Sequence, residues 1–144
     1  PSSGVLARMT DDELLRLSFR DLPLSRTRGR VADHMRRLHR ELRGRGLRFL
    51  PHFWYAEEWF SPDGVPGIAL PFYLSHPRLM RLERSLMHQV EGGSSQWLMR
   101  ILRHEAGHAI EAAIVEGLEA RECTADVGGS LKASAAADAV VHVA

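Results

Sequence analysis

One segment, residues 96–115, sets the strongest constraint on how this chain can fold. Its apolar residues recur at the three- and four-residue spacing of an α-helix, as Trp97, Leu98, Ile101 and Leu102 show. A helix with one apolar face buries that face against another layer of secondary structure. The chain has 144 residues, which suits one domain with a single core.

This predicted helix contains the sequence His104-Glu105-Ala106-Gly107-His108. Residues four apart on an α-helix are one turn apart and face the same side, so both imidazoles can bind one Zn²⁺ at about 2.0–2.1 Å. Glu105 lies beside such a metal and can act as general base towards water, whose pKa zinc lowers to about 7. The pattern predicts a zinc-dependent hydrolase with metal ligands His104 and His108 and catalytic residue Glu105.

A longer stretch carries a family resemblance. The segment "EEWFSPDGVPGIALPFYLSHPRLMRLERSLMHQVEGGSSQWLMRILRHEAGHAI" resembles a bacterial family of zinc-binding metallopeptidases, which are zincin-like proteins. The resemblance covers about Leu14 to Ile110 and includes "LSFRDLPL" and "LRGRGLRFLPHFW". It implies a zincin-like metallopeptidase domain over residues 1–122 that hydrolyses peptide or protein substrates, with the same three site residues.

The chain departs from the family pattern after Ile110, and its change of composition predicts a truncated or frame-shifted end. Residues 123–144 form an Ala-rich tail of low complexity, which we expect to be disordered. Within this region nothing in the spacing selects a third zinc ligand. Glu111 would be strained in reaching a metal bound by both histidines, and four other candidates could fold back from further along the chain: Glu119, Glu122, Asp126 and His142.

The fold class we expect is α+β. Segments 47–56 and 65–74 are predicted to be strands joined by the turn Ser61-Pro62-Asp63-Gly64, with Pro62 at its second position. We expect them to pair as an irregular hairpin in a small, partly antiparallel sheet, packed on the metal-binding helix and two or three further helices. Segment Ile68–Leu74 is the candidate edge strand for binding a peptide substrate by strand addition.

The basic residues are unevenly distributed, because nine of the nineteen lie between Arg26 and Arg48. This region could bind nucleic acid, but no aromatic residue interleaves with its arginines, so we predict a solvated helix face and no specific nucleic-acid partner. The single cysteine, Cys123, and the absence of about 18 consecutive apolar residues predict a soluble, cytoplasmic protein without membrane contact.

Three functions therefore follow from the sequence. The first is a zinc-dependent peptidase, or the N-terminal part of one. The second is a catalytically inactive zinc-binding or interaction module, because no third ligand is identifiable. The third is a nucleic-acid-binding domain that uses the Arg26–Arg48 region. The sequence leaves the oligomeric state open.

Overall fold

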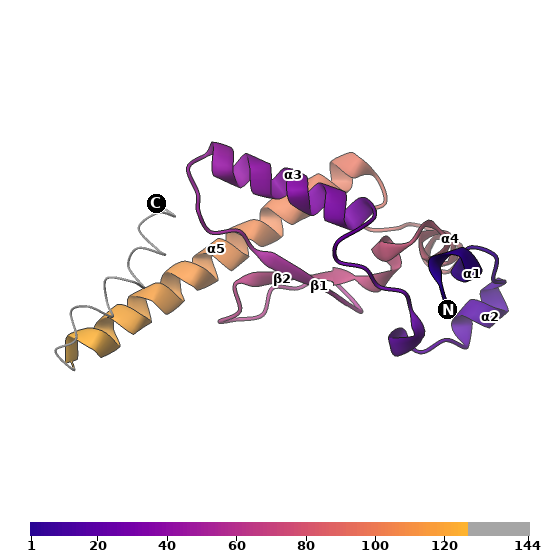
Figure 1. Ribbon diagram of the computed structural model, residues 1–144, viewed down its shortest axis with the longest axis horizontal. Helices are drawn as coiled ribbons and strands as arrows, with labels where there is room; N and C mark the ends of the chain where they lie inside the picture. The colour runs from indigo at the N-terminus through magenta and orange to yellow at the C-terminus, as the bar shows by residue number, and fades with distance from the viewer. Residues whose placement is uncertain (127–144) are drawn as a thin grey trace.

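A computed structural model describes residues 1–126, which form an α+β protein (Figure 1). Over this part of the chain the structure has five α-helices, two short 3-10 helices and one two-stranded sheet. The elements in chain order are α1 (Ser3–Leu6), α2 (Asp11–Leu15), η1 (Phe19–Asp21), α3 (Arg30–Gly44), β1 (His52–Ala56), β2 (Gly67–Pro71), η2 (Phe72–Ser75), α4 (Pro77–Met87) and α5 (Ser95–Asp126).

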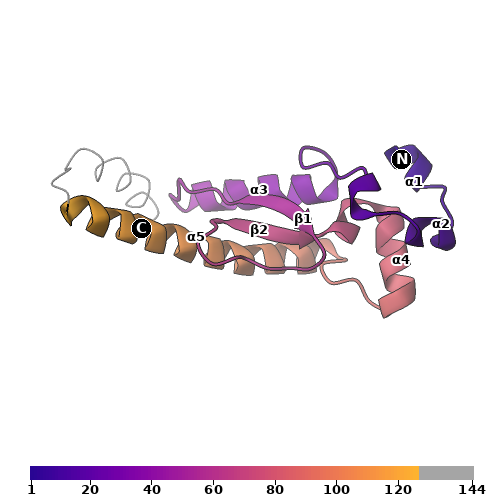
Figure 2. The same ribbon diagram turned by 90° about the horizontal axis from the view of Figure 1, so that it is seen from below.

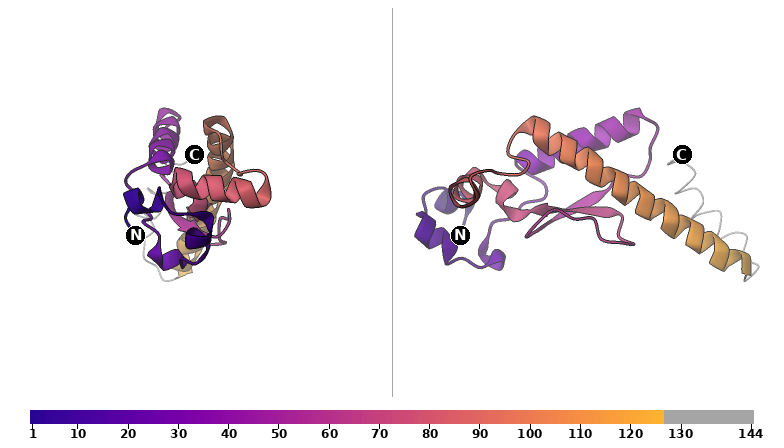
Figure 3. Two further views of the ribbon diagram at one scale, coloured as in Figure 1. Left: turned by 90° about the vertical axis from the view of Figure 1, so that its right-hand side faces the viewer. Right: turned by 180° about the vertical axis from the view of Figure 1, so that it is seen from behind.

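The two long helices, α3 and α5, cover the same face of the sheet, as the end-on view in Figure 3 shows. Helix α5 contacts both α3 and β2. The short helices α1 and α2 gather with α4 at one end of the sheet (Figure 1). The C-terminal part of α5 extends past the opposite end, beyond α3 and both strands (Figure 2).

The core lies where these layers meet. Leu98 and Leu102 of α5 are fully buried, together with Leu38 of α3 and Ile68 and Leu70 of β2. Burial of one such side chain contributes about 1.5–3 kcal/mol to folding. The apolar stripe predicted for residues 96–115 is therefore the stripe that α5 packs into the core.

The sheet differs from the predicted hairpin, because β1 and β2 are parallel, with His52 opposite Gly67 and Ala56 opposite Pro71. The prediction of a partly antiparallel sheet is wrong for these strands. The connecting segment 57–66 is too long for a tight hairpin and passes to the other edge of β2. There Phe60 forms one antiparallel bridge with Ala69. All five residues of β2 are buried, which is typical of a strand in a parallel sheet.

The connecting segment contains the predicted turn, displaced by one residue. The amide of Val65 donates to the carbonyl of Pro62 at 3.2 Å, so Pro62 occupies the first position of the turn and not the second. Asp63 and Gly64 are then its central residues. Gly64 has φ 73°, a left-handed conformation that favours glycine.

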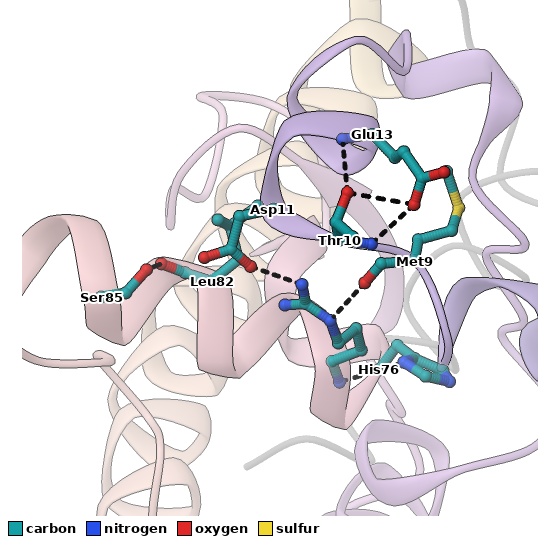
Figure 4. Close-up of polar contacts among 8 residues, drawn as sticks. Met9, Thr10, Asp11, Glu13, His76, Leu82 and Ser85 are labelled. Atoms are coloured by element: carbon teal, nitrogen blue, oxygen red, sulfur yellow. Dashed lines mark hydrogen bonds and ion pairs between the residues drawn. The ribbon is translucent and has the colours of Figure 1, made fainter.

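The N-terminal segment is joined to α4 by Arg78, which is buried. Its guanidinium donates to the carbonyl of Met9 at 3.0 Å and pairs with the carboxylate of Asp11. Figure 4 shows Met9 and Asp11 in these contacts beside Thr10 and Glu13, which form a capping box at the start of α2.

Several arginines of the Arg26–Arg48 region make contacts within the protein. Arg30 donates to the carbonyls of Gly92 and Gly93 at 2.8 and 3.0 Å, and burial lowers the pKa of its guanidinium. Glu41 accepts from Arg37 at 3.1 Å. These contacts support a structural role for part of the region, and the absence of a specific nucleic-acid partner stays a prediction.

The predicted tail begins within helix α5. Helix α5 continues through Asp126, so the first four residues of the predicted tail, 123–126, are helical. The remainder of that tail lies outside the described residues.

Over residues 1–126, no helix has the length and apolar character needed to span a bilayer.

Two glycines give opposite predictions for stability. An added Cβ at Gly107, inside α5, would meet nothing within 4 Å, so the sequence does not need glycine there for close packing. We expect Gly107→Ala to stabilise the protein by about 0.5–1 kcal/mol, because alanine favours the helix. At Gly67 the added atom would lie 2.6 Å from the Trp54 ring.

We therefore expect Gly67→Ala to destabilise the protein by about 1–3 kcal/mol through overpacking. Urea unfolding of both variants and the wild type measures the two free energies. A destabilised Gly107→Ala variant would contradict the open surroundings of that position.

Candidate metal centre

Helix α5 brings His104 and His108 together, as the sequence predicts. Their Nε2 atoms lie 3.2 Å apart, and the two rings are nearly perpendicular, at 88°. Two nitrogens bound to one tetrahedral zinc at 2.0–2.1 Å are separated by about 3.3 Å. The pair therefore has the spacing that a shared Zn²⁺ requires, and without a metal the same atoms are within hydrogen-bond distance.

The rotation of α5 decides where this pair points. The buried positions Leu102, Ala106 and Ala109 face the core, whereas His104 and His108 are exposed. At about 100° per residue, the two histidines lie on the side of the helix away from its buried stripe. Both rings are thus open to solvent, and a metal ion could approach them without movement of the core.

Glu105 lies between the buried stripe and the histidine face and is half-buried. Its Oε2 accepts a hydrogen bond of 2.8 Å from the hydroxyl of Ser61, in the segment between the strands. From the sequence, Ser61 is predicted only as part of a turn and not as a site residue. Since 44 residues separate the pair, no local pattern could have found this contact.

An open groove of about 650 Å³ runs between α5 and the turn at residues 61–64. His108 and Ser61 both line it, on opposite walls. Glu111 and Glu116 continue the helix wall, and Asp63 lies on the turn. The groove therefore begins at His108, one of the two candidate metal ligands, and has space for an extended peptide.

Within residues 1–117, whose side chains the structure describes, no group of three His, Cys, Asp or Glu side chains is arranged to bind a metal. Glu111 is exposed and is not part of such a group.

The other candidate ligands lie further along the chain, and the sequence selects none of them. Because α5 is continuous, Glu119 is eleven residues beyond His108, about 16 Å along the axis at 1.5 Å per residue. Glu122 and Asp126 are further still. The helical backbone of α5 carries these three residues away from the histidines, and His142 lies outside the described residues.

Two other histidines make structural contacts within the protein. His34 bonds the carbonyl of Arg30 and the hydroxyl of Ser95, which joins α3 to the start of α5. His39 bonds the carbonyl of Pro51 at 2.9 Å. These rings are engaged away from the metal pair.

Comparisons of the chain with protein-family models, with curated proteins and with solved structures found no match in any of the three. The resemblance to zinc-binding metallopeptidases and the zincin-like fold therefore stay predictions. The proposal of function therefore depends on the geometry of α5 and its neighbours.

The Nε2 separation predicts that the purified chain binds about one Zn²⁺. We expect His104→Ala combined with His108→Ala to abolish binding, because each histidine supplies one of the two nitrogens. Elemental analysis after purification without chelator measures the metal content, and zinc titration during thermal unfolding measures the stabilisation that binding confers.

The matched control is His88→Asn, which changes an exposed histidine outside the site. Asparagine tolerates the left-handed conformation of that residue, at φ 63°. Equal metal content in the wild type and the double variant would contradict the site.

Proposed function

We propose that this chain is a zinc-dependent peptidase, or the N-terminal part of one, with a zincin-like arrangement around α5. The observation that carries the proposal is the 3.2 Å separation of the His104 and His108 Nε2 atoms, which fits two ligands of one tetrahedral ion. Both residues are exposed, and His108 lines a groove with room for substrate. The single cysteine and the absence of a spanning helix over residues 1–126 support the proposal of a cytoplasmic protein.

The three candidate site residues would have different roles. His104 and His108 would hold Zn²⁺, which when bound supplies a Lewis acid for a peptide carbonyl and for water. Glu105 would accept a proton from the attacking water and later pass it to the leaving amine. Because Ser61 occupies Oε2, the proton would be taken by Oε1, which has no hydrogen-bond partner among the side chains of residues 1–117.

The structure favours a different substrate site from the edge strand predicted by the sequence. Strand addition along Ile68–Leu74 was expected, but Ala69 already uses its amide and carbonyl to pair with Phe60, at 2.9 and 3.4 Å. The other edge of β2 is paired with β1. A peptide would therefore lie in the groove between α5 and the turn at 61–64, where it passes beside His108.

A second candidate is a zinc-binding module without turnover. It is favoured by the side chains of residues 1–117, which offer the candidate ligands His104 and His108 but no third ligand beside them. Such a module would bind zinc through the same nitrogens. The two functions differ in whether a peptide is hydrolysed in a manner that depends on Glu105.

Glu105→Gln distinguishes them. The amide has nearly the shape of the carboxylate, but it cannot accept a proton at neutral pH, so we expect retained zinc binding and a 10²–10⁴-fold loss of turnover, roughly the cost of removing a general base. Hydrolysis of a peptide library by the zinc-loaded chain measures this loss. The control Glu91→Gln changes an exposed carboxylate in the loop before α5 and should leave turnover unchanged.

If the wild type is active and Glu105→Gln keeps the same rate, another group carries out the hydrolysis. Zinc binding without hydrolysis in either form would favour the second candidate.

A further inference from the structure

We propose that Ser61 is a positioning residue for the general base, and that its hydroxyl holds the Glu105 carboxylate in the orientation needed for proton transfer. This inference rests on the proposed peptidase function. It assigns a role to a residue outside the His-Glu-x-x-His pattern, from the opposite wall of the groove.

The contact is direct and joins two distant parts of the chain. The Ser61 hydroxyl donates to Glu105 Oε2 at 2.8 Å, and both side chains are half-buried. A hydrogen bond to an ionised carboxylate is stronger than one between neutral groups. Partial burial further limits competition from water, so this bond is a suitable restraint on a side chain with several rotatable bonds.

Ser61 is itself held in place by its neighbours. Immediately before it, Phe60 pairs with Ala69 through two backbone hydrogen bonds. Immediately after it, the turn from Pro62 to Val65 closes. Since Ala69 is fully buried in β2, the sheet fixes the position from which the hydroxyl reaches α5.

The consequence for Glu105 is selection of one carboxylate oxygen. With Oε2 held by Ser61, rotation of the carboxylate is restricted and Oε1 is the oxygen that remains for water. Loss of the hydroxyl would leave the carboxylate in several orientations, most of which are unproductive. A misplacement of about 1 Å at a reacting group can cost about 10²-fold in rate.

The kinetic test compares Ser61→Ala, Ser61→Thr and Glu105→Gln in the zinc-loaded chain. We expect Ser61→Ala to lower kcat by about 10- to 100-fold with KM and zinc content unchanged, and Ser61→Thr to restore most of the rate because it keeps the hydroxyl. In the Glu105→Gln background, Ser61→Ala should cause no further loss. Ser85→Ala is the matched control, since that hydroxyl bonds a carbonyl within α4.

The second test needs no activity. Thermal unfolding of the metal-free wild type, Ser61→Ala, Glu105→Gln and the double variant forms a double-mutant cycle. We expect the two single shifts in Tm to be non-additive, because each variant weakens the same contact. Additive shifts would overturn the inference whatever the activity of the chain.

Non-additive shifts with an unchanged kcat in Ser61→Ala would also overturn it, because the contact would then be structural only. A chain that binds zinc but hydrolyses no peptide contradicts the proposed function and with it the positioning role. The unfolding cycle distinguishes that case, since it reports the Ser61–Glu105 contact independently of turnover.

Discussion

The packing of α5 against β2 and α3 is the constraint on which the rest of the structure depends. Leu98, Leu102 and Ala109 are fully buried, and together they fix the rotation of the helix about its own axis. Once that rotation is fixed, helical geometry sets the direction of every other side chain. Glu105 then lies beside the core, and His104 and His108 face solvent.

A second contact holds α5 in register with α3 next to this site. Arg103 donates two hydrogen bonds to Glu41, at 2.8 and 2.9 Å, and these bonds lower the pKa of the Glu41 carboxyl. A lowered pKa means that the stabilisation is present near neutral pH and is lost as the pH falls through that value. The pair is partly exposed, so its contribution is modest beside that of the buried stripe.

The sheet shows why the strand arrangement was not predictable from the alternation of side chains. His52, Phe53, Trp54 and Tyr55 alternate between exposed or half-buried and buried positions, a pattern that a parallel and an antiparallel partner satisfy equally well. The connection between the strands decides between a parallel and an antiparallel partner. It passes to the far edge of β2, where Phe60 pairs with Ala69, before the chain turns back into β2. That pairing also places Ser61 opposite α5.

The sequence by itself determined the local parts of this protein: the capping box at Thr10 and Glu13, the apolar stripe of α5 and the approach of His104 to His108. Each depends on residues three or four apart, and the helix fixes those separations. Only the tertiary structure decided the parallel sheet, the groove beside His108 and the bond from Ser61 to Glu105. Such contacts join residues far apart in the chain, so their geometry arises from the packing of one layer on another and leaves no periodic pattern in the sequence.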